Sequence, residues 1–440
     1  MPDHAISSDA EVQRQLDRLN SLSPGADVLG LERITVLLER LGNPERRLPP
    51  VFHVAGTNGK GSTCAFLRAA LEAAGKTVHV YTSPHLVRFN ERIRVAGTLV
   101  DDAMLASLLD EVLTIADGVS PSFFEVTTAA AFLAFARTPA DACIIEVGLG
   151  GRLDATNVLP HPAVCGIAQL GIDHQFFLGD TIEEIAGEKA GIAKAGVPLV
   201  TFTYPASQAE RIRSAAQAVG APWLARGEAW DISIHRGKLH YSDEAGQLDL
   251  PLPRLPGAHQ ASNAGLAIAM LRHQTAIEVP AGALRAAMGW AEWPARLQRL
   301  TAGPLPALLP EGSELWLDGG HNPAAARAIA EFFRTRLAPG RPFHIILGML
   351  ANKDLGGFLE PFAGLGIKLH AVPVPGHEHH DAATIAAAAR ANGLEADSGP
   401  DAPTVLRAIG APDGAAPIVL VGGSLYLAGR VLDANGTPPT

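Results

Sequence analysis

The stretch that decides the fold is residues 51–74, VFHVAGTNGKGSTCAFLRAALEAA. It begins with an apolar run typical of a buried strand, passes through a Gly-rich turn at residues 56–61, and continues as a helical pattern that Gly75 closes. Glycines let the backbone approach an anion closely, while loop N–H groups, the helix N-terminus and Lys60 supply positive charge. We therefore predict a strand–loop–helix unit whose ligand is a phosphate chain.

This turn differs from the standard phosphate-binding loop, G-x-x-x-x-G-K-[ST], in two respects. Val54 stands at the first position, and Gly61 separates Lys60 from Ser62. The alternative interpretation is a Gly-rich turn with an incidental lysine. The strand pattern before the turn and the helix pattern after it favour the phosphate loop.

Length and composition limit the class of protein. The chain has 440 residues, 47% of them hydrophobic, which predicts two domains. A net charge of −10 argues against a nucleic-acid partner, and no apolar run is long enough for a membrane span. The N-terminus lacks the pattern of a secretion signal, so we expect a cytoplasmic protein. Cys64, Cys143 and Cys165 match no metal motif and are expected to be buried free thiols.

Strand and helix patterns alternate along the chain, which predicts an α/β fold with a mostly parallel sheet. Besides residues 51–54, we expect strands at residues 77–81, 142–147, 164–170 and 198–202. We expect helices at residues 9–19, 31–41, 62–74, 101–115, 125–136, 181–194 and 264–272. Residues 230–242 alternate around Arg236 and Gly237 and predict a hairpin at the edge of this sheet.

The α/β rhythm restarts after residues 293–296, and we place the domain boundary there. Residues 1–294 are predicted to form the first domain, and residues 295–440 a smaller Rossmann-like domain. Strands are expected at residues 315–317, 344–347, 368–374 and 418–421. Helices are expected at residues 324–337, 355–362, 382–391 and 404–409.

Polar side chains follow several strands of the first predicted sheet. They are Lys60 and Ser62 in the loop, then Ser83, Glu146 and His174. Because ligands gather at the carboxyl ends of strands in open α/β sheets, we expect these residues to form one site. A metal beside a phosphate loop is most simply Mg²⁺ bridging ATP phosphates. A solvated strand-end carboxylate is the alternative for Glu146.

With these motifs in place, the sequence resembles the bifunctional dihydrofolate synthase/folylpolyglutamate synthase family of the Mur ligase superfamily over nearly its whole length. The motifs that carry the resemblance are AGTNGKGS (55–62), SPHLVRFNERIRV (83–95), FFE (123–125), IIEVGLGGRLDATNV (144–158), GIDH (171–174), EKAGI (188–192), DGGHNP (318–323) and GMLANKD (348–354). The resemblance implies a Mur-ligase-like ATPase domain that also binds the pterin, followed by a glutamate ligase domain.

The resemblance also implies a role for individual residues. The implied ATP-binding residues are Thr57, Asn58, Gly59, Lys60, Gly61, Ser62, Asn263, Arg296, Asp318 and His321. The implied metal ligands, for two Mg²⁺ ions, are Ser83, Glu146, His174 and Lys189. The implied substrate-binding residues are Leu29, Gly30, Ser122, Phe123, Phe124, Glu125, Leu153, Asp154 and Ala155. The implied catalytic residues are Lys60, Lys189 and His174.

One of these residues has an alternative interpretation, and two other positions depart from the family pattern. Lys189 matches a lysine that is carbamylated in the family, although an ordinary surface ion pair is the alternative. Ala295 stands where the family usually has Gly, and Asn352 where Asp is common. A monovalent cation is a further candidate cofactor.

The implied reaction joins L-glutamate to dihydropteroate and to reduced folates. ATP phosphorylates the substrate carboxylate, and the glutamate amine attacks the acyl phosphate. The expected partners are ATP and these substrates, with neither nucleic acid nor membrane, and a monomer is expected. The alternatives are a monofunctional folylpolyglutamate synthase, another Mur-type amino-acid ligase, a P-loop kinase and a catalytically silent ATP-binding protein. The His-rich loop, residues 376–381, is interpreted as a substrate-side or solvated loop before a helix that Asp381 caps.

Overall fold

The computed structural model describes residues 5–22, 29–410 and 415–440. Two compact units divide between Glu292 and Trp293, and residues 255–259 belong to the second unit. The division into two domains, residues 1–294 and 295–440, stays a prediction. Within the described ranges, no helix is both long enough and apolar enough to cross a membrane.

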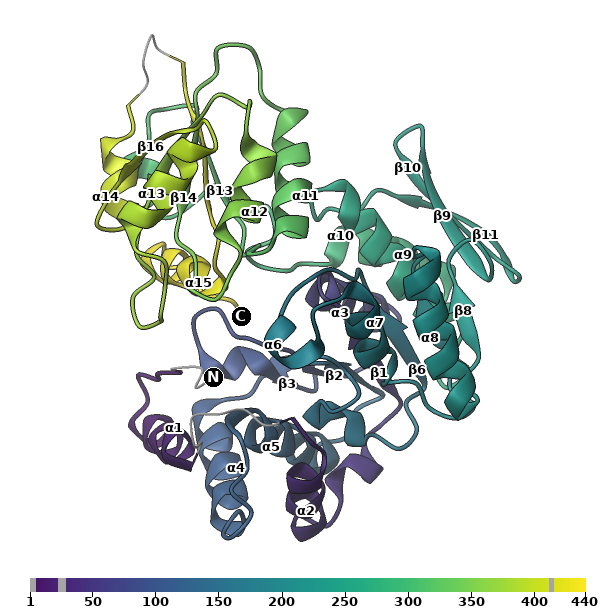
Figure 1. The fold of residues 1–440 in the computed structure, drawn as a ribbon. Coiled ribbons are helices and arrows are strands. Elements are labelled where there is room, and N and C mark those ends of the chain that lie inside the picture. Colours follow the sequence, from purple (N-terminus) through teal and green to yellow (C-terminus); the bar gives the residue numbers. More distant parts are fainter. Residues whose placement is uncertain (1–4, 23–28, 411–414) are drawn as a thin grey trace. The chain divides into compact units, whose positions relative to one another are not determined.

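The first unit is built on an eight-stranded sheet with the order β4-β3-β2-β5-β1-β6-β7-β8 (Figure 1). The strands are β1 (Val51–Ala55), β2 (Val78–Tyr81), β3 (Ile93–Val95), β4 (Thr98–Leu99), β5 (Ala142–Glu146), β6 (Val164–Ile167), β7 (Leu199–Thr201) and β8 (Trp223–Ala225). All neighbours pair in parallel except at β3 and β4, which form an antiparallel edge. The mostly parallel sheet is confirmed, and it gathers the carboxyl ends of β1, β2, β5 and β6 at one edge.

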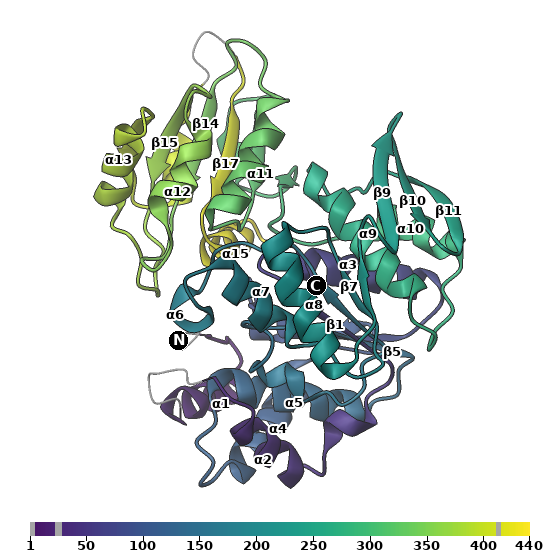
Figure 2. The same cartoon turned by 45° about the vertical axis from the view of Figure 1, so that its right-hand side comes forward.

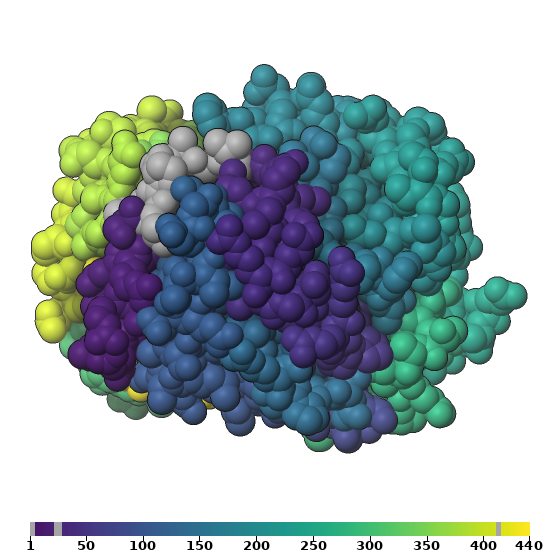
Figure 3. Space-filling model, turned by 90° about the horizontal axis from the view of Figure 1, so that it is seen from below, coloured from purple at the N-terminus to yellow at the C-terminus, as the bar shows by residue number. Residues whose placement is uncertain are grey.

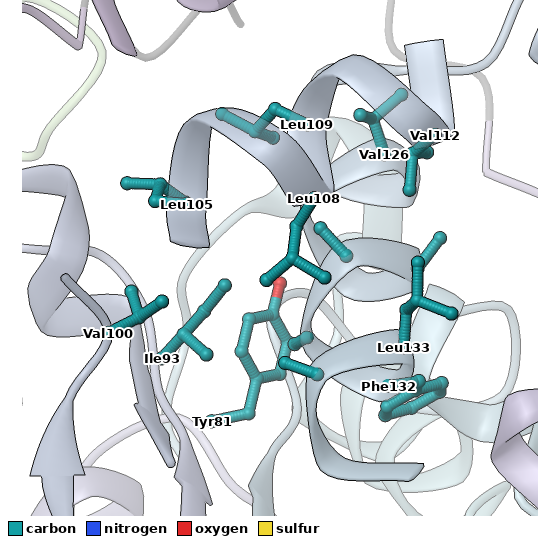
Figure 4. Packing of buried hydrophobic residues seen from close by; sticks show 14 of the residues in the cluster. Tyr81, Ile93, Val100, Leu105, Leu108, Leu109, Val112, Val126, Phe132 and Leu133 are labelled. Atoms are coloured by element: carbon teal, nitrogen blue, oxygen red, sulfur yellow. The ribbon is translucent and has the colours of Figure 1, made fainter. Parts of the chain in front are cut away.

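Helices cover this sheet. They are α1 (Ala10–Leu22), α2 (Glu32–Arg40), α3 (Lys60–Ala73), α4 (Asp102–Ile115), α5 (Phe123–Arg137), α6 (Gln175–Leu178), α7 (Ile182–Ala190), α8 (Ala206–Val219), α9 (Ala258–Arg272) and α10 (Ala281–Trp290). The surface over α1, α2 and α4 is the purple and blue area of Figure 3. Beneath it, residues of α4 and α5 pack around the fully buried Tyr81 of β2, whose ring points toward Leu108 (Figure 4). This core holds β2 and β5, and therefore the strand ends that carry polar residues, in fixed positions.

The hairpin predicted at residues 230–242 is present, but its predicted place is wrong. Strands β9 (Trp230–His235), β10 (Lys238–Asp243) and β11 (Gly246–Pro251) form a separate antiparallel sheet, visible beside α9 in Figure 1. The edge position of the main sheet is taken by β8, which pairs with β7. The small sheet packs on α9 instead. The packing is close at Gly265 of α9, where a Cβ would lie 2.7 Å from the side chain of Ile232.

The second unit contains a six-stranded sheet with the order β12-β13-β17-β14-β15-β16. Its strands are β12 (Gln298–Leu300), β13 (Glu314–Leu317), β14 (Phe343–Leu347), β15 (Ile367–Ala371), β16 (Glu395–Ser398) and β17 (Ile418–Gly422). Its helices are α11 (Pro323–Arg334), α12 (Leu355–Leu359), α13 (Ala382–Ala391), α14 (Ala402–Ala408) and α15 (Leu425–Ala434). Helices α11, α12 and α13 share a core with one face of the sheet (Figure 2). The four predicted strands are confirmed, whereas β12, β16 and α15 were not predicted.

Candidate active site

The phosphate loop joins β1 to α3 as predicted, and its glycines are required by geometry. Gly59 has a φ of +86°, in the left-handed region that favours glycine. At Gly56, with a φ of +147°, a Cβ would lie 2.9 Å from the side chain of Ala168. Lys60 is the first residue of α3, and its Nζ lies 3.2 Å from Gly56 O. The loop therefore presents the N-terminus of α3 and one ammonium group together, which suits an anionic ligand.

The loop that follows β6 is hydrogen-bonded to the phosphate loop. Thr57 N and Asn58 N donate to Gln169 O at 2.8 and 3.1 Å. Thr57 Oγ1 lies 3.0 Å from Gly171 O. These bonds place the segment that leads to His174 beside the phosphate loop.

Two residues of α9 extend the phosphate loop. The side chain of Asn263 lies against Gly59, where a Cβ would be 2.4 Å from Asn263 Oδ1. Asn263 Nδ2 donates to Gln260 Oε1 at 3.0 Å, and Gln260 Nε2 reaches Ser62 Oγ at 3.3 Å. Gln260 was missed by the sequence analysis. The signal was a pair of amides, Gln260 and Asn263, three positions apart at the start of a helix whose later residues are mostly apolar.

Ser83 and Glu146 come together at the ends of β2 and β5. Ser83 N donates to Glu146 Oε2 at 3.3 Å, and Glu146 is 4% exposed. Burial raises the pKa of the Cys64 thiol, and the charges of Glu146 and Lys60 both act on this thiol, so both lie near it. The carboxylate therefore lies close to the phosphate loop.

His174 is the next of these polar residues along the sequence after Glu146, but its side chain is much more exposed than that of Glu146. It precedes α6 with a φ of +54°, its side chain is 44% exposed, and its Nε2 lies 3.9 Å from Asp173 Oδ1. Its predicted meeting with Glu146 on a metal stays a prediction.

The donor set at this edge fits a magnesium ion. The described residues contain no group of three His, Cys, Asp or Glu side chains arranged to hold a metal by themselves. Mg²⁺ is typically held by only one or two carboxylates, with water and substrate phosphates completing its octahedron. Glu146, with the Ser83 hydroxyl, meets that requirement.

Lys189 of α7 is buried beside the phosphate loop. It is 4% exposed, and burial lowers the pKa of its amine to about 7, helped by the nearby charge of Lys60. Asp173, Asp154 and Glu188 act in the opposite direction but are weaker. Because Lys189 is buried, it is not the surface ion pair that was the alternative for this residue.

The predicted substrate residues at the start of α5 separate into structural and accessible groups. Ser122 caps the helix, and Glu125 completes a capping box, with Ser122 N donating to Glu125 Oε2 at 2.6 Å. Glu125 also pairs with Arg33 Nε of α2 at 2.9 Å, and Phe123 is buried in the core. Phe124 is half-buried, and its ring covers Gly148, where a Cβ would lie 2.3 Å from the ring.

The other predicted substrate residues lie in two loops. In the loop after β5, Asp154 is 2% exposed and accepts a hydrogen bond from Leu149 N at 2.7 Å. Leu153 is half-buried and Ala155 is buried. Leu29 and Gly30, before α2, are half-buried.

The second unit brings together the nucleotide-binding residues predicted for it. Asp318, at the end of β13, accepts hydrogen bonds from Leu297 N and Gly320 N, both at 2.7 Å. A Cβ at Gly319 would lie 2.9 Å from Arg296 Nη1, and His321 Nδ1 lies 3.1 Å from Gly319 O. These contacts place Arg296, Asp318 and His321 around one strand end.

His259 was missed in this part of the site. Burial lowers its pKa, while the charge of Asp318 raises it and that of Arg296 lowers it. His259 therefore lies beside both residues. The His-rich loop of the same unit behaves as predicted at Asp381, which caps α13, and His377 stacks on Tyr426 with ring centroids 3.7 Å apart.

Comparisons with known proteins identify the class first. Residues 54–271 match the Mur ligase middle domain, and residues 308–425 match the glutamate ligase domain of Mur ligases. The chain is therefore an ATP-dependent ligase of the Mur type.

Relatives at the level of whole chains then define the family. The dihydrofolate synthase/folylpolyglutamate synthase of Bacillus subtilis is 35% identical, over 90% of this chain and 93% of that protein. The Escherichia coli enzyme of the same name is 36% identical over 78% of this chain and 77% of its own. The structure of E. coli FolC in complex with DHPP and ADP is 33% identical and covers 98% of both chains with a TM-score of 0.85. The chain belongs to the dihydrofolate synthase/folylpolyglutamate synthase family.

Proposed function

We propose that this protein adds L-glutamate to dihydropteroate and to reduced folates, with Mg²⁺ as the metal. The observation that carries the proposal is the agreement of the whole chain, at a TM-score of 0.85, with an enzyme solved with DHPP and ADP. A second solved relative, 31% identical over 98% of this chain, was obtained with Mn, AMPPNP and L-glutamate. Mn, ADP, AMPPNP, DHPP and L-glutamate are thus all ligands of solved members of the family.

The phosphate loop supplies the positive charge for carboxylate activation. Lys60 and the N-terminus of α3 lie at one end of the loop, where the γ-phosphate of ATP would be transferred to the substrate carboxylate. Two Mg²⁺ ions held by Ser83, Glu146, His174 and Lys189 would neutralise the developing phosphate charge. No side-chain nucleophile is needed, because the amine of glutamate attacks the acyl phosphate and releases phosphate. Holding the reactants in place and excluding water contribute the rest of the catalysis.

Carbamylation of Lys189 agrees with its surroundings. An amine with a pKa of about 7 is partly uncharged at neutral pH and can add to carbon dioxide. The ammonium form first loses a proton; addition of the neutral amine to carbon dioxide then forms an N–C bond and releases a second proton, which leaves an anion beside Lys60. The product is a carboxylate-like ligand for a divalent ion.

The family resemblance divides the remaining residues between nucleotide and pterin. It assigns Asn263, Arg296, Asp318 and His321 to the nucleotide; Asn263 lies against the phosphate loop, and the other three gather at one strand end of the second unit. On the pterin side, Phe124 and Leu153 are the accessible apolar residues, and Leu29 and Gly30 are also assigned to the pterin. Ser122, Phe123, Glu125, Asp154 and Ala155 would shape the pterin site rather than contribute exposed surface.

The test is release of ADP that depends on glutamate, first with dihydropteroate and then with tetrahydrofolate as the acceptor. Turnover with both acceptors is expected. Turnover with tetrahydrofolate alone would reduce the proposal to a monofunctional folylpolyglutamate synthase. ADP release that does not require glutamate would favour a kinase, and a requirement for another amino acid would favour a different Mur-type ligase. The expected monomer, the cytoplasmic location and the monovalent cation stay predictions.

A further inference from the structure

A buried chain of hydrogen bonds runs from the middle of β1 to the loop after β5. His53 is fully buried in β1, and its Nε2 lies 2.9 Å from Thr156 Oγ1. The Thr156 hydroxyl in turn lies 2.5 Å from Asp154 Oδ1. Neither His53 nor Thr156 has a role in the proposed function, although both are completely shielded from solvent.

The direction of donation along this chain follows from the partners at its two ends. Asp154 accepts from Thr156 N at 3.0 Å and from Leu149 N at 2.7 Å, as a carboxylate does, so the Thr156 hydroxyl donates to it. Thr156 Oγ1 is then an acceptor, and His53 must donate through Nε2–H. Within the described part of the chain, His53 Nδ1 is buried without a hydrogen-bond partner. A bare lone pair is tolerated there, whereas a buried N–H would cost more.

Asp154 holds the loop after β5 in shape. Its Oδ2 accepts from Leu149 N, so the carboxylate spans both ends of the turn that contains Gly151. At Gly151 the loop lies directly on α7, because a Cβ would be 2.7 Å from Glu188 O and 2.9 Å from Lys189 O. A change in the Asp154 carboxylate would therefore reach the backbone of Lys189.

We propose that His53 is a positioning residue, which acts through Thr156 to fix the Asp154 carboxylate and thereby the loop of residues 148–155 against Lys189. The inference rests on the proposed function, because that function assigns this loop to the pterin and Lys189 to the metal. His53 contacts no reacting atom. Its contribution is a single N–H donor held at one point in the core, which keeps the Thr156 proton directed at Asp154.

Two matched pairs of variants test this role in the full chain. His53→Gln keeps an amide N–H near the position of Nε2, whereas His53→Leu removes the donor. Thr156→Ser keeps the hydroxyl, whereas Thr156→Val removes it. We expect the Leu and Val variants to lose about 10- to 100-fold in kcat/KM for glutamate addition. A loss of this size is typical when a residue that orients a ligand-binding residue through a hydrogen bond is removed. The Gln and Ser variants should stay within about threefold of the parent.

Two further measurements separate positioning from general loss of structure. ADP affinity should be the same in all four variants, because the phosphate loop is not altered. Hydrogen exchange in the peptide of residues 148–155 should be faster in the Leu and Val variants only. The proposal is overturned if the Leu and Val variants keep the parental kcat/KM, or if all four variants fall alike. Loss of thermal stability with unchanged exchange in this peptide would also overturn it.

The exchange measurement does not depend on catalysis. An absence of glutamate-dependent turnover in the parent protein would therefore refute the proposed function, while the exchange comparison would still decide whether the hydrogen-bond chain holds the loop. The Thr156 pair supplies the same test if His53→Leu fails to fold.

Discussion

The contact between Gly148 and Phe124 gives a sharp test of the pterin side of the site. In Gly148→Ala, the new Cβ would lie 2.3, 2.7 and 2.8 Å from three atoms of the Phe124 ring, each much closer than ordinary contact. Because Gly148 follows the buried strand β5, the ring must move rather than the backbone. Overpacking of this kind costs about 1–3 kcal/mol.

The expected effect on function is weaker binding of the pterin substrate. An aromatic contact contributes about 0.5–1.5 kcal/mol beyond simple burial, and about 1.4 kcal/mol corresponds to a factor of ten. We therefore expect the KM for dihydropteroate to rise by about 2- to 10-fold, with the KM for ATP unchanged. The assay is steady-state ADP release with each substrate varied in turn.

The same substitution elsewhere provides the control. Gly289 lies in α10, and a Cβ there would meet nothing within 4 Å, so Gly289→Ala should leave both KM values unchanged. In the double variant Gly148→Ala/Phe124→Leu the clash is relieved, so its loss of stability should be smaller than the sum of the single losses. An unchanged KM for dihydropteroate in Gly148→Ala would refute the placement of Phe124 at the pterin site.

Three further predictions concern single side chains. Lys60→Ala should abolish turnover while the circular dichroism spectrum stays that of the parent, because it removes the ammonium group that the loop itself carries at the N-terminus of α3; near-normal activity would contradict the assignment. Arg33→Met should lower the free energy of unfolding in urea by about 1–3 kcal/mol, because it removes the ion-pair partner of the buried Glu125, and an unchanged unfolding midpoint would argue against this pair. Burial lowers the pKa of His344 to about 4, so the unfolded chain binds the proton more readily and stability should fall as the pH drops from about 6.5 to 4. His344→Asn should reduce that slope in urea unfolding curves, and an identical slope would exclude His344 as its source.

The parts of the fold that were predicted correctly depend on local chemistry. The glycines of the phosphate loop lie between β1 and α3, and Gly75 lies just after the end of α3. These local signals place β1 and α3 almost to the residue. The place of the β9–β10 hairpin depends on a competition that the sequence pattern does not record. Strand β8 pairs with β7 and takes the sheet edge, so the hairpin pairs with β11 instead.

The site was predictable to the extent that it follows from strand order. Ser83 and Glu146 were expected to meet because β2 and β5 end at the same edge, and the structure places them in hydrogen-bonding contact. Gln260 and His259 were missed because polar residues at the start of a helix, even a pair of amides such as Gln260 and Asn263, do not show which distant residues they face. The low pKa of Lys189 depends on burial and on Lys60, a residue far away in the sequence, so only the folded chain reveals it.

The central claim is that the phosphate loop serves to activate a carboxylate by phosphorylating it. The most direct measurement uses dihydropteroate labelled with oxygen-18 in its carboxylate, together with ATP and L-glutamate, and follows the label in the phosphate released. Formation of an acyl phosphate predicts that one labelled oxygen from each carboxylate appears in inorganic phosphate. Phosphate without label, at a normal rate of amide formation, would contradict the account.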